Sequence, residues 1–410
     1  MSTTADGPVN TAADEVFPYP AGPGGTVPPR YARLLAEEPV SRVRLADGTA
    51  IWLVTRDADV RTVLTDPVFS RARAAALPGT GFGRSQGAGI VDLDPPRHTA
   101  FRTPVAAAFS AARTARWRAR IEEIAGHLAA SLGEIPEPVD LVGSYTAPFA
   151  GRVVCELLGF DGDRWREITG DVESLLMSGD ADGPEQEACR TRLAKAFTGL
   201  LDERRSRDGD DVAGVLLGQD DPDAGGGKLT DEERVVLLHG LVISGFIGVR
   251  DLLARHLYGV LADPGVRDRL VRRPELIPGA VAELLRFYPS SNDGLLRMAT
   301  EDVELSGVRV PAGAAVLPLV SAACRDPRVL DRPGELDIER PETPTLSFGA
   351  GPHRCPATDL VLVQHAAGIG ELLAAHPRIG LAVAPGDVAH TSQLLPLGVA
   401  ALPARLDTPP

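Results

Sequence analysis

Lysine is almost absent from this chain, since Lys195 and Lys228 are the only lysines among its 42 basic residues. Acidic residues outnumber basic ones, 56 to 42, and the formal net charge at neutral pH is −14. This balance argues against nucleic acid or an anionic membrane as the main partner, because both attract basic proteins. We therefore expect a small-molecule substrate.

Cysteine is scarce as well, with four residues in 410 and no short paired spacing. Four cysteines are too few for a disulfide framework in a chain of this length and fit a reducing compartment. Long apolar runs are also missing, because no stretch approaches the roughly 20 consecutive apolar residues that a membrane helix needs, and the first 20 residues show no signal pattern. The expectation is a cytoplasmic monomer without a membrane segment.

The chain is long enough for one large domain, and we expect a single domain over residues 1–410. Residues 1–30 are rich in Gly and Pro and predict an irregular arm, which short strands follow at 43–45 and 50–54. Residues 70–96 show no sustained period and predict a long loop.

From residue 97 to about 261 apolar residues recur at spacings of three and four, which predicts helices. Thr230 and Glu233 form a capping box, so the longest helix is expected over 231–262, about 48 Å long. A further helix is expected at 278–288. Alternation over 302–317, broken by glycine turns, predicts short strands. The fold class is mainly α with minor β.

One glycine-rich loop, residues 346–355, delivers a single cysteine, Cys355, just before an apolar segment that starts at Leu360. A thiolate near a helix N-terminus has a lowered pKa, because the helix dipole and backbone donors stabilise its charge. Glycine lets the backbone approach the sulfur and any bound group closely. The loop therefore predicts a reactive or metal-binding thiolate, and the competing interpretation is a buried structural cysteine after a glycine turn.

The spacing of Phe348, Gly349, Gly351, His353 and Cys355 resembles the signature of the cytochrome P450 superfamily, in its soluble bacterial class. The resemblance implies haem b as cofactor, with the Cys355 thiolate as axial ligand to the iron and with Phe348 and Gly349 in the cofactor-binding loop. Such a ligand donates electron density and favours O–O cleavage. The implied fold is a triangular prism with a long central helix over the haem and a small sheet on the N-terminal side.

Two other motifs agree with this resemblance. Glu283 and Arg286 lie one helical turn apart and 72 residues before the cysteine, and Arg340 resembles the third member of the family's Glu–Arg–Arg group. Buried together, these side chains would form a structural network that stabilises the haem-binding core.

The resemblance also assigns residues to the haem propionates. His98 and Arg102 would share one helical face, and Arg297 and His353 would provide further donors. Pairing of arginine with carboxylate makes this assignment chemically reasonable. Taken alone, His98 and Arg102 would more often belong to a solvated helix face.

The chain departs from the family in the middle of its long helix. Counting back from Glu283 puts Ile247 where most members have an acid and Gly248 where they have an alcohol. Neither residue can relay a proton, so Ser244, ordered water or the substrate would have to replace the pair. Ser244, Gly245 and Gly248 are accordingly the catalytic candidates, and loss of activity is the competing interpretation.

Pro356 after the cysteine, together with the missing alcohol, resembles the branch that couples aromatic side chains of cyclic dipeptides. The first hypothesis is therefore radical coupling of a tryptophan- or tyrosine-containing diketopiperazine. The second is hydroxylation or epoxidation of a macrolide, terpenoid or peptide natural product with substrate-assisted protonation. The third is a haem-binding protein that recruits another enzyme and catalyses nothing itself.

The family's substrate-contacting regions are mainly apolar in this chain, which suits a medium-sized hydrophobic ligand. The candidate contacts are Arg84, Gln86, Phe246, Asn292, Leu295, Gln393 and Leu394. Because the chain has no flavin or iron–sulfur motif, electrons are expected from NAD(P)H through a ferredoxin reductase and an acidic ferredoxin. A basic docking surface for that ferredoxin is expected at Arg97, Arg113, Arg116, Arg118 and Arg354.

Overall fold

The structure is a computed structural model that describes residues 16–77, 89–177, 183–207, 209–218, 229–291, 293–341, 345–391 and 397–407. Contacts divide the chain into two compact units. Unit 1 comprises 1–85, 291–336 and 342–355, and unit 2 comprises 86–290, 337–341 and 356–410. The units interleave along the chain, so no single linker separates them, and the expectation of one domain stays a prediction.

Unit 1 is built on a five-stranded mixed sheet in the order β1-β2-β8-β5-β3. The strands are β1 (Val40–Arg44), β2 (Ala50–Val54), β3 (Phe69–Ser70), β5 (Arg297–Ala299) and β8 (Ala315–Pro318). The pairing of β2 with β8 is parallel and the other pairings are antiparallel. The central strand β8 is buried at all four residues, as its apolar sequence requires.

Short helices and one hairpin complete unit 1. The helices are α1 (Arg30–Glu37), α2 (Asp57–Thr65), α3 (Arg71–Ala75) and α13 (Val320–Ala323). The hairpin joins β6 (Val303–Leu305) to β7 (Val308–Val310), and both turn residues between them, Ser306 and Gly307, have positive φ. A two-residue turn of this kind matches the twist of antiparallel strands. The predicted strands in 302–317 are thereby confirmed.

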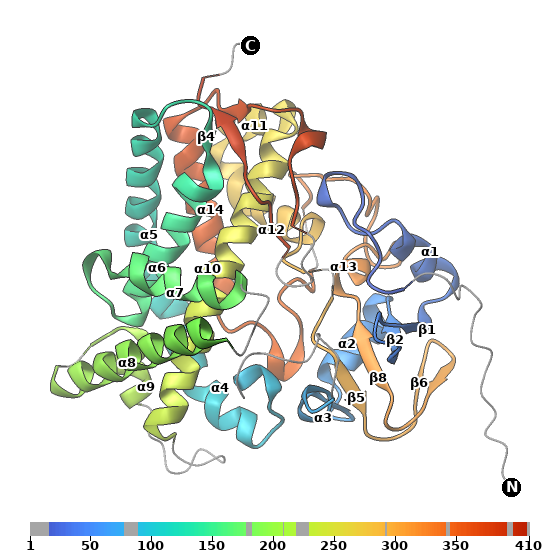
Figure 1. Cartoon of the computed structure of the whole chain (residues 1–410). Helices are drawn as coiled ribbons and strands as arrows, with labels where there is room; N and C mark the ends of the chain where they lie inside the picture. Colours follow the sequence, from blue (N-terminus) through green and yellow to red (C-terminus); the bar gives the residue numbers. More distant parts are fainter. Residues whose placement is uncertain are drawn as a thin grey trace, which may run out of the picture. The chain divides into compact units, whose positions relative to one another are not determined.

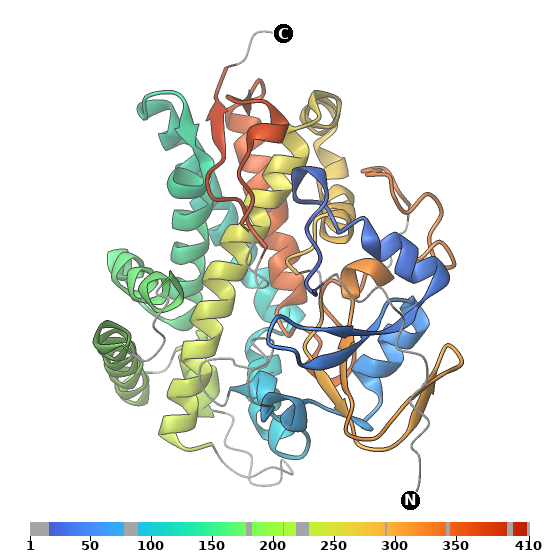
Figure 2. The same cartoon turned by 45° about the vertical axis from the view of Figure 1, so that its right-hand side comes forward.

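Unit 2 is mainly helical, and Figures 1 and 2 show that α5 and α14 run alongside α10 (Asp231–Leu261), the longest of its helices. The other helices are α4 (Arg97–Ala108), α5 (Ala111–Ser131), α6 (Ala147–Leu158), α7 (Trp165–Met177), α8 (Pro184–Ser206), α9 (Val212–Gly218), α11 (Pro264–Arg272), α12 (Ile277–Phe287) and α14 (Thr358–Ala375). A small sheet in the order β4-β10-β9 lies at one end of the unit, formed by β4 (Val139–Asp140), β10 (Pro403–Arg405) and β9 (Gly380–Leu381).

Helix α10 confirms the predicted long helix and its capping box. The Thr230 hydroxyl accepts a hydrogen bond from the Glu233 backbone N–H, and the Glu233 carboxylate accepts one from the Thr230 N–H. The helix packs against α6, α8, α12 and α14. A Cβ built on Gly368 of α14 would lie 2.8 Å from Leu253 Cδ2, so glycine permits this close helix contact.

Two expectations about the elements need correction. Within the described residues α10 is long and apolar enough to cross a membrane by length and composition, so the statement that no stretch approaches this limit was too strong. Its packing inside unit 2 is that of a core helix. The segment 70–96 is also not wholly irregular, because Ser70 caps the short helix α3 through the N–H of Arg73.

A buried histidine pair joins α10 to α14. The Nδ1 atoms of His256 and His365 lie 2.9 Å apart, and both side chains are fully buried. His256 Nε2 lies 3.3 Å from the Tyr288 carbonyl and must donate to it, so its Nδ1 accepts from His365. Burial lowers the pKa of His365 to about 3 and that of His256 well below its ordinary value.

Candidate functional site

The loop that carries Cys355 belongs to unit 1 and is fixed by its own backbone. The Gly349 N–H donates to the Leu346 carbonyl at 2.7 Å, and the Cys355 N–H donates to the Phe348 carbonyl at 2.8 Å. Gly349 and Gly351 have φ values of 71° and 68°, which residues with a side chain rarely adopt. The loop conformation therefore depends on the glycines of the predicted signature.

Close packing also requires glycine in this loop. A Cβ built on Gly351 would lie 2.5 Å from the Leu64 carbonyl oxygen at the end of α2. At the start of the loop, the Leu346 N–H donates to the buried Cys324 thiol with an N–S distance of 3.2 Å. These contacts hold the loop against unit 1 at both its start and its middle.

Cys355 differs from the other three cysteines in its surroundings. Cys155, Cys189 and Cys324 are buried, whereas Cys355 is partly accessible. Burial raises the pKa of the Cys155 thiol to about 12 and raises that of Cys189. Thiols with raised pKa values are poor metal ligands at neutral pH. Among the described cysteines, Cys355 is the best placed to bind a metal.

Helix α14 begins at Thr358, three residues after the cysteine, so Pro356 lies in a turn before the helix. His353 lies in the 3-10 helix η7 (Gly351–His353) and is partly buried.

Arg297 begins strand β5 and is only 2% exposed. Its Nη1 donates to the Leu295 carbonyl at 2.9 Å, and Arg71 Nη1 donates to the Leu296 carbonyl at 3.2 Å. Leu296 is buried in the core, whereas Leu295 stays partly accessible. Of the predicted substrate contacts in unit 1, Leu295 thus has side-chain surface to offer.

Asp293, close in sequence to Leu295, carries a buried carboxyl group. The Tyr31 hydroxyl donates to Asp293 Oδ1 at 3.1 Å, and both side chains are buried. Burial raises the pKa of Asp293 to about 7, against a lowering by the Tyr31 hydrogen bond. Desolvation thus dominates, and the carboxyl is largely protonated below neutral pH.

In unit 2, His98 and Arg102 lie four residues apart on α4, as predicted. His98 is 2% exposed and Arg102 is partly exposed, so His98 is not on a solvated helix face. Arg97 next to it forms an ion pair with Glu233 and lies over the Phe101 ring.

The catalytic candidates lie together on α10, but their surroundings differ. Ser244 is exposed. A Cβ built on Gly245 would lie 2.6 Å from Val154 Cγ2 of α6, whereas one built on Gly248 would meet no heavy atom of the described residues within 4 Å. Gly245 is thus explained by helix packing, and Gly248 faces open space.

Phe246 was predicted to contact substrate, but it is 1% exposed and lies under the Arg250 guanidinium. Its ring belongs to the packing of unit 2, and it has almost no surface to offer a ligand. Ile247 is 6% exposed and apolar, so it cannot act as an acid.

The predicted Glu–Arg–Arg network is confirmed. Glu283 accepts two hydrogen bonds from Arg286 at 2.7 and 2.8 Å, one from Arg340 at 3.3 Å and one from the Asp337 N–H at 3.0 Å. Glu283 and Arg286 are fully buried. The network holds α12 to the segment 337–341 of unit 2.

Several predicted substrate contacts lie outside the described residues. They are Arg84, Gln86, Asn292, Gln393 and Leu394.

The arginines of the predicted docking surface are largely paired with acids. On α5, Arg113 and Arg116 both pair with Asp210, and Arg118 lies 3.8 Å from Glu122. Arg97 pairs with Glu233, and Arg354 is exposed in unit 1. Because acids neutralise much of this charge, the surface of unit 2 is less basic than the sequence suggested.

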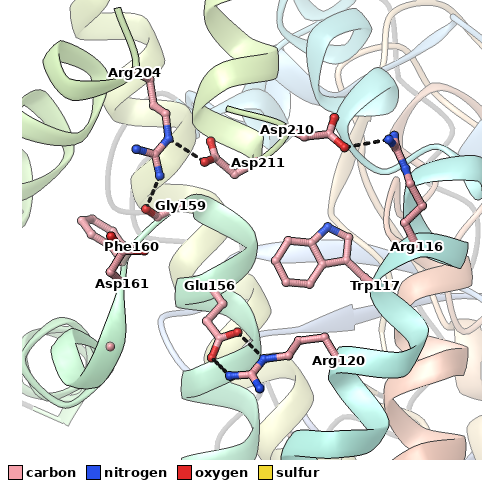
Figure 3. A pocket seen from close by; sticks show the side chains of 11 residues that line it. Arg116, Trp117, Arg120, Glu156, Gly159, Phe160, Asp161, Arg204, Asp210 and Asp211 are labelled. Atoms are coloured by element: carbon pink, nitrogen blue, oxygen red, sulfur yellow. Dashed lines mark hydrogen bonds and ion pairs between the residues drawn. The ribbon is translucent and has the colours of Figure 1, made fainter. Parts of the chain in front are cut away.

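A surface cavity of about 640 Å³ lies between the ends of α5, α6, α8 and α9 in unit 2 (Figure 3). Ion pairs surround the Trp117 indole there, including Arg120 with Glu156 at 2.8 Å and Arg204 with Asp211 at 2.6 Å. Arg116 of the predicted docking surface lines this cavity, but none of the predicted catalytic, haem-binding or substrate-contacting residues does. We therefore do not identify it with the predicted site.

The donor set of the described residues fits a haem. Cys355 offers one soft sulfur donor on a loop whose glycines leave room for close approach. His98 and Arg297 are buried nitrogen donors of the kind that carboxylates require. A sulfur donor suits the iron and buried nitrogen donors suit the propionates of the group that the resemblance implies.

Comparisons with known proteins agree with this chemistry. The family model described as Cytochrome P450 matches residues 258–373. Nocardicin C N-oxygenase from Nocardia uniformis subsp. tsuyamanensis is 37% identical over 88% of this chain and 90% of that protein. Mycinamicin IV hydroxylase/epoxidase from Micromonospora griseorubida is 33% identical over 96% and 99%. The structure of cytochrome P450mel 107F1 with biaryl coupling reactivity matches with a TM-score of 0.80 and 32% identity, covering 92% of this chain and 96% of that one.

Proposed function

From the premise that the chain belongs to the cytochrome P450 family of haem-thiolate monooxygenases, we propose that it inserts oxygen into a natural product of intermediate size. Its fold is that of the family, and its electrons come from NAD(P)H through a ferredoxin system. The relatives support this substrate class, because their names specify oxygenation of nocardicin C and hydroxylation or epoxidation of mycinamicin IV. We place the enzyme in the cytoplasm.

The single observation that carries the proposal is the rigid Cys355 loop. In it, Cys355 would bind the iron, and Phe348 and Gly349 would belong to the cofactor-binding loop. His98, Arg102, Arg297 and His353 would bind the propionates. Bound haem supplies activation of molecular oxygen, a chemistry that side chains alone cannot provide.

The chain's own residues position the substrate and exclude water. Leu295 offers a partly accessible apolar side chain, and its backbone carbonyl is held by Arg297. A fixed carbonyl and a fixed apolar side chain suit recognition of a largely hydrophobic ligand.

The experiment that tests the proposal is the carbon monoxide difference spectrum of the reduced, haem-loaded protein. We expect the absorption characteristic of thiolate ligation, and we expect Cys355→Ala to abolish it. Cys155→Ala is the matched control, because Cys155 is buried in α6, and it should keep the absorption. An unchanged spectrum in the Cys355 variant would refute the proposed ligand.

A second candidate function is oxidative coupling of an aromatic cyclic dipeptide. The observation that favours it is the pair Ile247 and Gly248, which leaves α10 without the hydroxyl and acid that usually support oxygen insertion. The coupling relative adds support, although its printed description does not mention cyclic dipeptides. Turnover under ¹⁸O₂ separates the candidates, because oxygen insertion labels the product and coupling leaves it unlabelled.

A further inference from the structure

Four residues on α10 form a stripe along one face of the helix: Ser244, Gly248, Asp251 and Arg255. Their spacing of four, three and four residues keeps them within a sector of about 60°, because a helix turns about 100° per residue. Gly248 leaves open space at the middle of this stripe, since no heavy atom of the described residues lies within 4 Å of a built Cβ. A hydroxyl and a carboxyl thus flank an open position on the same helix face.

Asp251 is buried, but Arg250 links it to a carboxylate at the surface of unit 2. Asp251 is 6% exposed, and Arg250 Nε donates a hydrogen bond to its Oδ1 at 2.7 Å. The same guanidinium donates through Nη1 to Glu173 Oε1 of α7 at 2.8 Å, and the Glu173 side chain is 44% exposed. One arginine is therefore shared between a buried and an exposed carboxylate.

The surroundings of Asp251 favour its protonated form more strongly than the surroundings of a surface aspartate would. Burial raises the pKa of Asp251, whereas the hydrogen bond from Arg250 and the charge of Arg255 oppose this effect. Glu173 of α7 acts on Asp251 by competing for Arg250. From the C-terminal segment the backbone at Gly398 packs against the carboxyl, since a Cβ there would lie 2.9 Å from Asp251 Cγ.

Oxygen insertion consumes protons, because one O₂, two electrons and two protons yield one inserted oxygen atom and one water. We propose that Asp251 is the proton donor for this reaction and that it releases its carboxyl proton to water in the space at Gly248. Seven residues of helix separate Ser244 from Asp251 by about 10 Å, so the Ser244 hydroxyl holds the far end of a short chain of waters in this space. Arg250 then compensates the Asp251 carboxylate until bulk water returns a proton, while Glu173 takes part of the Arg250 charge. This assignment rests on the proposed monooxygenase function.

The test replaces Asp251 by asparagine, which keeps the shape but removes the exchangeable proton. NADPH-driven oxygen consumption is measured in H₂O and D₂O on the haem-loaded enzyme with a surrogate ferredoxin and reductase. General acid catalysis is typically worth 10² or more, so we expect consumption to fall by at least about tenfold and the solvent isotope effect to rise. Asp251→Glu should restore most of the rate, and Glu232→Gln, on the exposed first turn of α10, should change nothing.

A readout independent of turnover is the infrared difference spectrum between the wild type and Asp251→Asn. Because burial raises the pKa of Asp251, we expect the carbonyl stretch of its protonated carboxyl group in the wild type at acid pH, and we expect it to disappear as the pH rises. Absence of this band, or an unchanged rate and isotope effect in Asp251→Asn, would overturn the proposal. These results are distinct from failure of the proposed function, which would show as loss of the thiolate-type absorption in the wild type.

Discussion

Replacement of Glu283 by glutamine should lower the stability of unit 2 more than a Glu→Gln substitution at an exposed position. Glu283 and Arg286 have no exposed side-chain surface, and Arg340 is nearly buried. The amide removes the negative charge and leaves two guanidinium groups without compensation in a dry environment. Breaking one side of a buried ion pair costs about 3–5 kcal/mol. The ratio of folded to unfolded protein should therefore fall by roughly a hundredfold to a few thousandfold.

The assay is urea unfolding of the haem-loaded protein, followed by far-ultraviolet circular dichroism. Glu275→Gln is the matched control, because Glu275 is exposed and pairs with Arg273 at 3.3 Å. Exposed pairs contribute about 0–1 kcal/mol, so the control should unfold close to the wild type. If Glu283→Gln lost less than about 1 kcal/mol, or no more than the control, the buried network would not carry the stabilising role assigned to it.

Three further predictions concern stability. Gly248→Ala should leave the free energy of unfolding unchanged or raise it by up to about 1 kcal/mol, because alanine favours helix and its Cβ meets no heavy atom of the described residues. Gly245→Ala should lower the free energy of unfolding by about 1–3 kcal/mol, because its Cβ would clash with Val154. Equal thermal midpoints for the two variants would contradict this reasoning. Burial raises the pKa of Asp293 to about 7, so the folded state binds more protons than the unfolded state between about pH 4 and 7. The free energy of unfolding should therefore fall by up to about 4 kcal/mol as the pH rises through this range. Asp293→Asn should flatten that part of a stability–pH profile, and an unaltered profile would count against a buried neutral acid. The lowered pKa values of His256 and His365 act in the opposite sense, so stability falls as pH drops below about 6.5 toward 3. His365→Asn, whose amide can replace the Nδ1 donor, should move acid unfolding to lower pH, and an acid midpoint identical to the wild type would rule the pair out as its cause.

Local signals predicted the features that depend on neighbours in sequence. The capping box at Thr230 and Glu233 set the start of α10 at the observed residue, because the two groups satisfy each other within one turn. The hairpin around Ser306 and Gly307 followed from turn residues that adopt positive φ. The pairing of Glu283 with Arg286 likewise needs only one helical turn.

Features that depend on distant partners could not be predicted in this way. Tyr31 and Asp293 are separated by 262 residues, and no pattern near either residue indicates the other. The packing reason for Gly245 lies on α6, so the sequence of α10 suggested a catalytic role instead. Asp251 is an intermediate case, because its helical spacing from Gly248 was visible but its link through Arg250 to Glu173 was not.

The interleaving of the two units bears on how the chain folds as the ribosome makes it. Strand β2 ends at Val54, but its parallel partner β8 is completed only at Pro318. At about 5–20 residues per second, that interval of about 264 residues takes roughly 13–50 s. During this time the nascent β1–β2 ribbon has an unsatisfied edge, while most helices of unit 2 have already emerged. Helix α14, which packs against α5, α10 and α12, follows β8 in the chain, so the sheet of unit 1 can be completed before the last helix of unit 2 is made.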